Sequence, residues 1–224
     1  MDKGQFDQLI AVMNRTETTE WITMIVLILS FVIGAGTLLY ARKQLLADHA
    51  RSRRQLAIEM CSHWSSFISP ETASVTRLIE RMLPDQCEAI ATSGKLSIGI
   101  DHKLHLLNIL QLRFPDVEMK LTELQKGNMY EIDGQYVLYI RHIAIRYLNM
   151  LESILLSWAM GVADPKVIES EFSYLFDEEK GRTAMEGLRK KVGMEGFPAI
   201  EQFMKTLRER TKARSDKVVR RSVT

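Results

Sequence analysis

The chain has 224 residues, a formal net charge of +2 and two cysteines, Cys61 and Cys87. A body of about 150 residues can bury a core without disulfide staples, so the sequence predicts one ordinary domain rather than a disulfide-rich scaffold. The spacing of the two cysteines also excludes a zinc knuckle, because neither has a second cysteine within four residues.

The near balance of charge hides a segregation along the chain. Residues 1–40 carry −2, residues 41–54 carry +4, residues 55–204 carry −6 and residues 205–224 carry +6. The chain is therefore an acidic body between two basic segments.

Residues 21–40 run for twenty residues without a charge, from Trp21 to Tyr40. A helix of that length is about 30 Å long, which matches the hydrocarbon core of a bilayer. Trp21 and Tyr40 lie where aromatic rings prefer the headgroup boundary. The sequence predicts a membrane-spanning helix; the alternative, a buried helix of a soluble core, seldom carries such a run.

The flanking charges predict the orientation of this span. Four acidic residues and two basic ones precede it, whereas residues 41–54 hold five basic residues and one acidic residue. The positive-inside rule then places the N-terminus outside and residues 41–224 in the cytoplasm, where a reducing environment disfavours a disulfide. A cleaved signal peptide is the alternative, but it requires a basic start and a shorter apolar stretch.

Residues 1–20 are expected to form an external tail. Phe6, Leu9, Ile10 and Met13 share one helical face, so residues 2–14 form either an amphipathic helix on the membrane surface or a frayed tail. Beyond the span, residues 41–67 contain neither glycine nor proline. The helix should therefore continue as a basic stalk over residues 41–55.

Residues 56–204 show helical periodicity, with cap and proline signals at helix starts. The expected helices cover residues 70–82, a short segment from Pro84, 102–114 capped by Asp101, 115–126, 135–160, a segment from Pro165 capped by Asp164, 183–192 and a segment from Pro198. Asp133–Gly134 is the best turn signal and leaves a small hairpin open, although the run after it favours helix. The predicted fold is all-α: a transmembrane helix and stalk followed by a cytoplasmic helical bundle.

The helix over residues 135–160 carries charged residues that include Arg146 and Glu152. In mid-membrane each would cost a few kcal/mol without a partner, which argues against a second span. The two residues diverge by about 240° around the helix. In a soluble bundle each charge can reach the surface or a neighbouring helix.

One part of the domain has a characteristic layout. The segment RYLNMLESILLSWAMGVADPKVIESEF, followed by FPAIEQFMKTL and preceded by one span and a polar stalk, resembles a family of small bacterial single-pass membrane proteins. The helical cytoplasmic domain of that family has no assigned function. The resemblance implies a bacterial inner membrane and a phage-related or defence context, and it offers no catalytic residues.

The search for catalytic motifs finds no Gly-rich phosphate loop, no Gly-x-Ser-x-Gly elbow and no His-Glu-x-x-His pair. His102 and His105 lie three residues apart beside Asp101 and could offer two ligands to a metal ion. Two polar positions on an amphipathic helix are the favoured interpretation. We therefore expect no catalytic residues and no cofactor, and a metal enzyme using His102 and His105 remains the alternative.

The span carries a stripe of small residues that could bring two helices together. The stripe consists of Thr23, Ser30, Gly34, Thr37 and Ala41, which fall within about 40° of one line. The sequence predicts a homo-oligomer through this stripe, against the alternative of an inert span that faces lipid.

The basic residues of the stalk divide by distance from the span. Arg42 and Lys43 lie at the headgroups, where anionic lipid contributes about 1 kcal/mol each. Arg51, Arg53 and Arg54 lie roughly 15–20 Å further along an upright helix, beyond a Debye length of about 8 Å. Either the stalk tilts onto the membrane, or these residues meet a neighbouring subunit or another partner, or they are solvated.

The tail over residues 205–224 has eight Lys or Arg residues against two acidic ones and no aromatic residue. A disordered, solvated tail is favoured, followed by contact with anionic lipid and then with nucleic acid, which normally needs stacking rings. The function predicted overall is a membrane-anchored interaction or signalling module with a cytoplasmic protein partner. One form of this function would be an oligomeric membrane effector in phage defence. The alternatives are the metal enzyme and a protein that tethers nucleic acid through the tail.

Overall fold

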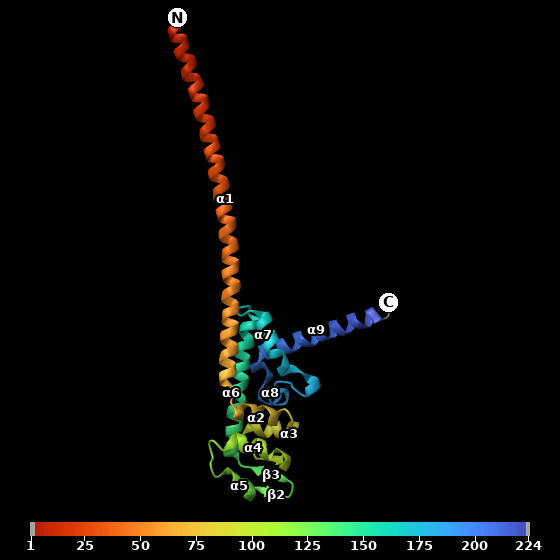
Figure 1. Cartoon of the computed structure of the whole chain (residues 1–224). Coiled ribbons are helices and arrows are strands. Elements are labelled where there is room, and N and C mark those ends of the chain that lie inside the picture. The colour runs from red at the N-terminus through yellow and green to blue at the C-terminus, as the bar shows by residue number, and fades with distance from the viewer. Residues whose placement is uncertain (1–2, 223–224) are drawn as a thin grey trace. The chain divides into compact units, whose positions relative to one another are not determined.

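The structure is a computed structural model that describes the backbone of residues 3–222 and the side chains of residues 21–213 apart from Ile22 and Glu178 (Figure 1). The chain is 78% helical and includes one long apolar N-terminal helix, which confirms the all-α class. The contacts between residues divide the chain into two compact units, Met1–Ser52 and Arg53–Thr224.

The first helix, α1, covers Lys3–Phe67 and so spans the whole stretch of residues 41–67 that lacks glycine and proline. Ser69 leaves the helical conformation, with φ −90° and ψ 164°, because the ring of Pro70 crowds the residue before it. The hydroxyl of Ser69 then accepts a hydrogen bond from the Thr72 amide at 3.2 Å and caps α2, Pro70–Ile79.

The remaining helices are α3 Pro84–Thr92, α4 Lys103–Leu110, α5 Val117–Glu123, α6 Gly134–Ala159, α7 Pro165–Phe172, α8 Glu186–Val192 and α9 Pro198–Ser222. Three of them, α3, α7 and α9, begin at prolines that the sequence marks, whereas α5 begins at Val117 and not at Pro115. Short 3₁₀ turns lie between them: η1 Ile100–His102, η2 Ser173–Phe176, η3 Glu178–Lys180 and η4 Met194–Gly196. The carboxylate of Asp164 caps α7 by accepting from the Lys166 amide at 3.0 Å, as expected.

A small antiparallel sheet was not foreseen. Its strands are β1 Leu96–Gly99, β2 Gln125–Lys126 and β3 Met129–Ile132, in the order β1-β3-β2. The predicted helix over residues 115–126 is therefore too long, because α5 stops at Glu123 and Gly127 turns the chain with φ 61°. The hairpin lies at this turn and not at Asp133, which is the N-cap of α6.

The prediction that Asp101 caps the next helix is wrong. The N-cap of α4 is His102, and no side chain caps this helix end. The amide of Ile100 still bonds the Asn128 carbonyl at 3.0 Å, so the chain leaves the sheet through η1 before α4 can begin.

Helix α6 lies at the centre of the domain and contacts α2, α3, α7 and α9. Its inward residues are Tyr136, Val137, Ile140, Ala144, Tyr147, Leu148, Leu151, Ile154, Leu155 and Trp158. They recur every three or four residues, which is the spacing of one face of a helix.

Arg146 and Glu152 of α6 find partners on different helices, in line with the prediction that each reaches the surface or a neighbouring helix. The guanidinium of Arg146 lies over the Phe67 ring, 5.1 Å from its centroid. The carboxylate of Glu152 accepts hydrogen bonds from the amides of Ala199 and Ile200, at 2.8 and 2.9 Å. Glu152 therefore caps the N-terminus of α9 from another helix, where a negative charge is favoured.

Arg189 on α8 is the one charged side chain that is completely buried among the described residues. Its Nη2 lies 3.3 Å from the Thr183 carbonyl and 3.3 Å from Oε1 of Glu201. Its Nε and Nη1 have no hydrogen-bond partner within the described part of the chain. Burial lowers the pKa of Arg189, against the opposing effect of the nearby carboxylates, yet guanidinium groups stay charged in proteins. The domain thus carries a buried cation that depends on its carboxylate neighbours.

Candidate functional site

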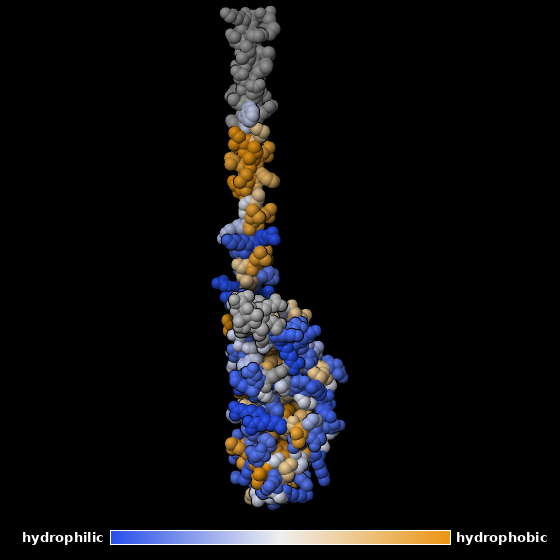
Figure 2. All heavy atoms as spheres, turned by 90° about the vertical axis from the view of Figure 1, so that its right-hand side faces the viewer, coloured by the Kyte–Doolittle hydropathy of each residue, from blue (hydrophilic) through white to orange (hydrophobic). Residues whose placement is uncertain are grey.

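The apolar stretch of α1 is exposed around its whole circumference, and it forms the orange band in Figure 2. The exposed fraction of its large apolar side chains runs from 43% at Met24 to 77% at Phe31. Within the described residues, one helix is long and apolar enough to cross a membrane, and it lies near the N-terminus. These side chains form no part of the domain core.

The small-residue stripe of the span presents few polar groups to its surroundings. Ser30 donates its hydroxyl hydrogen bond to the Val26 carbonyl at 2.7 Å, and Thr37 donates to the Ile33 carbonyl at 2.8 Å. A Cβ atom placed on Gly34 would meet no atom within 4 Å. Nothing among the described residues of this chain therefore requires glycine at position 34.

The basic residues of the stalk follow two patterns. Arg42, Lys43 and Arg51 are exposed. Arg53 accepts a hydrogen bond at its carbonyl from the Asp164 amide at 3.0 Å, and Nε of Arg54 lies 3.6 Å from Oδ2 of Asp164.

The partner of Arg54 thus lies in its own chain, and not in a neighbouring subunit or another protein. The capping signal of Asp164 was visible in the sequence. Its pairing with a residue more than a hundred positions away left no local pattern.

The rings of His102 and His105 lie near each other, with their centroids 6.4 Å apart. Nε2 of His102 is 3.5 Å from Oδ2 of Asp101. Burial, helped by the charges of Arg81, His102 and Arg77, lowers the pKa of His105. The structure brings no group of three potential metal-binding side chains together in the part of the chain it describes.

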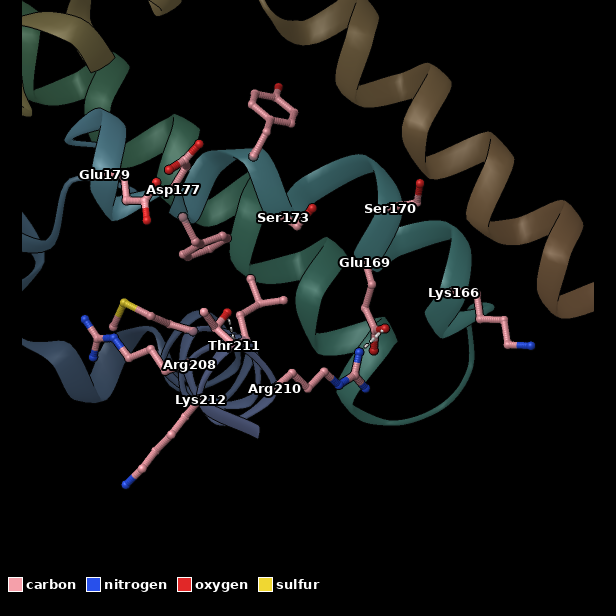
Figure 3. A pocket seen from close by; sticks show the side chains of 14 residues that line it. Lys166, Glu169, Ser170, Ser173, Asp177, Glu179, Arg208, Arg210, Thr211 and Lys212 are labelled. Carbon is pink, nitrogen blue, oxygen red and sulfur yellow. Dashed lines mark hydrogen bonds and ion pairs between the residues drawn. The ribbon is translucent and has the colours of Figure 1, made fainter. Parts of the chain in front are cut away.

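A groove of about 990 Å³ lies between α7 with η2 and the helix α9 (Figure 3). Phe176, Met204 and Leu207 contribute apolar surface to it. Charged side chains of both signs line it as well: Lys166, Glu169, Asp177, Glu179, Arg208, Arg210 and Lys212. The groove therefore combines apolar contact area with charged groups on both helices.

Glu169 ties the two sides of this groove together. It accepts a hydrogen bond from Nη1 of Arg210 (Figure 3). It also accepts one from Nε1 of Trp158 at 3.0 Å. Partial burial acts to raise the pKa of Glu169, but the hydrogen bonds from Arg210 and Trp158 outweigh it, so the pKa lies below its usual range. The carboxylate is therefore ionised at neutral pH and holds α9 against α6 and α7.

The basic tail differs from the expectation of a disordered segment, because α9 remains helical to Ser222. Two of its basic residues also pair within the chain. Arg210 contacts Glu169, and Arg208 lies 3.8 Å from Glu186. The start of the tail is thus part of the domain surface.

No sequence motif marked the groove, because its sides come from two helices that are about forty residues apart in the chain. No protein-family model, curated protein or solved structure matches the chain. The resemblance to small bacterial single-pass membrane proteins consequently stays a hypothesis.

Proposed function

We propose that this protein is a membrane-anchored helical interaction module. The span over residues 21–40 would hold it in a bacterial inner membrane, with the N-terminus outside and residues 41–224 in the cytoplasm. The observation that carries this proposal is the uncharged stretch of α1 whose apolar side chains are exposed on every face. Such a surface is stable in lipid and costly in water.

The groove beside α9 supports an interaction role for the domain. Protein interfaces combine apolar and polar contacts, and the groove offers side chains of both kinds. We propose that it receives a segment of a cytoplasmic protein that has apolar anchors flanked by charges of both signs. Such charges would complement Lys166 on α7 and Glu179 on η3.

The small-residue stripe supports self-association of the spans. If the resemblance to the bacterial family extends to a phage-defence context, clustering of the cytoplasmic domains would rearrange the spans and perturb the membrane. This last step rests on analogy with that family.

The orientation can be tested with reporters fused after Thr224. We expect a cytoplasmic fluorescent reporter to be bright and an alkaline phosphatase fusion to be inactive, because the basic flank stays inside. A matched variant that changes Arg42 and Lys43 to glutamate should raise phosphatase activity. High phosphatase activity of the unaltered protein would contradict the proposed topology.

The stripe can be tested by replacing Gly34 with leucine. A bulky side chain is tolerated by lipid but separates two closely packed backbones, so self-association in a membrane two-hybrid assay should fall several-fold while insertion is unchanged. Gly36→Leu is the control, because Gly36 also has open space around it but points about 200° away. Equal self-association signals from both variants would show that the stripe does not form the interface between the spans.

A further inference from the structure

A second cavity, of about 220 Å³, opens between the end of α1, α2, α6 and η2. Its apolar wall includes Trp64, Tyr147 and Tyr174. The rings of Trp64 and Tyr147 are 5.0 Å apart between centroids and tilted by 59°. Ligand pockets usually measure roughly 300–1,000 Å³, so this cavity suits a ligand the size of a single ring.

Tyr147 brings an unused donor to this cavity. Its side chain is only 3% exposed, and its hydroxyl forms no hydrogen bond with any residue that the structure describes. Burial raises the pKa of Tyr147, with smaller effects from Tyr174 and Glu80, so the phenol keeps its proton at neutral pH. Unlike the hydroxyl of Tyr136, that of Tyr147 is not a fully buried atom without a partner, so it is open to the cavity and can donate to a ligand there.

Two arginines at the mouth of the cavity add positive charge. Arg77 projects from α2, and Arg182 lies in the loop before α8. Arg182 acts electrostatically on Glu80 and Asp177, but no ion pair of either arginine is found among the described residues. The guanidinium of Arg182 stacks over the Tyr174 ring, 5.7 Å from its centroid, which positions it beside the aromatic wall.

Among the described residues that line this cavity, Glu80 is the one carboxylate, and backbone amides already bond to it. Its Oε1 accepts a hydrogen bond from the Thr183 amide at 3.3 Å, and the amides of Ala184 and Met185 also act on it. Burial raises the pKa of Glu80, while these amides and Arg182 oppose the shift. Glu80 is therefore a structural acceptor for the loop rather than a free charge for a ligand.

The loop that Glu80 holds is in an uncommon conformation. Ala184 and Met185 have φ values of 47° and 56°, which residues other than glycine rarely adopt. Such strain persists where the surroundings enforce it, and it is frequent at binding sites. Here it fixes the segment that follows Arg182.

We propose that this cavity binds a small aromatic carboxylate. The ring would lie against Trp64 and Tyr147, and the carboxylate would accept hydrogen bonds from Arg182, Arg77 and the Tyr147 hydroxyl. We expect an anion because the cavity offers two guanidinium groups and a phenol, while the carboxylate of Glu80 already bonds to backbone amides.

Benzoate is the probe, titrated calorimetrically into the full chain in detergent micelles. Benzamide keeps the ring without the charge, and acetate keeps the charge without the ring. We expect saturable binding of benzoate and at least tenfold weaker binding of both analogues. Arg182→Gln and Tyr147→Phe should each weaken benzoate binding by about tenfold, since each removes one hydrogen bond to an ionised group.

Arg113→Gln is the matched control, because Arg113 is an exposed arginine that does not line the cavity, and it should bind benzoate like the unaltered protein. Circular dichroism confirms that each variant is folded. Equal affinity for benzoate and benzamide would overturn the preference for an anion. No saturable benzoate binding, or binding that is unchanged in folded Arg182→Gln and Tyr147→Phe, would overturn the site.

Discussion

Replacing Arg189 with alanine should lower the free energy of unfolding of the domain by about 3–5 kcal/mol. The guanidinium is completely buried and lies 3.3 Å from Oε1 of Glu201, with Glu152 and Glu186 acting on it as well. Its removal leaves a cavity and several carboxylates without their common cation. Domains are stable by about 5–15 kcal/mol, so the loss is a large part of the total. Denaturant unfolding followed by tryptophan fluorescence measures it.

Lys190→Ala provides the control for this prediction. Lys190 is the next residue, and it forms an exposed ion pair with Glu186 at 2.6 Å. Exposed pairs contribute about 0–1 kcal/mol, so this variant should unfold nearly like the parent. The double variant Arg189→Met with Glu201→Gln should recover part of the loss, because it removes the unpaired charge and refills the space. If Arg189→Ala costs no more than Lys190→Ala, the buried network does not stabilise the domain.

A chain shortened to residues 53–210 should lose all membrane association and stay folded. It keeps Arg53 and Arg54, which contact Asp164, and Arg210, which contacts Glu169. It lacks the exposed apolar stretch, whose transfer into water is the unfavourable step. We expect a soluble protein without detergent, with a predominantly helical circular dichroism spectrum.

The control for this experiment is a chain of residues 21–210, which restores the span and should return to the membrane fraction. A shortened chain that needs detergent for extraction, or that gives an unfolded spectrum, would contradict a single span followed by an independent domain.

Several elements could be predicted from the sequence because their signals are local. Twenty uncharged residues define the apolar stretch of α1, and the helix starts at Pro70, Pro84, Pro165 and Pro198 follow from the geometry of proline. The central helix α6 also follows from a stripe that repeats within each turn. Each of these signals lies within a few residues of the element it specifies.

The sheet and the candidate sites depend on tertiary structure instead. Strand β1 pairs with β3 about thirty residues away, and both are too short to show alternation clearly. The sequence left open whether Glu152 reaches the surface or a neighbouring helix, and in the fold it caps α9 more than forty residues later. Glu80 orders the strained loop at Ala184 from about a hundred residues away. Such pairings leave no periodic pattern in the sequence. A glutamate that faces water and a glutamate that bonds to an amide of a distant segment cannot be told apart from their neighbouring residues. Only packing around α6, which brings those segments together, determines which partner each charge receives.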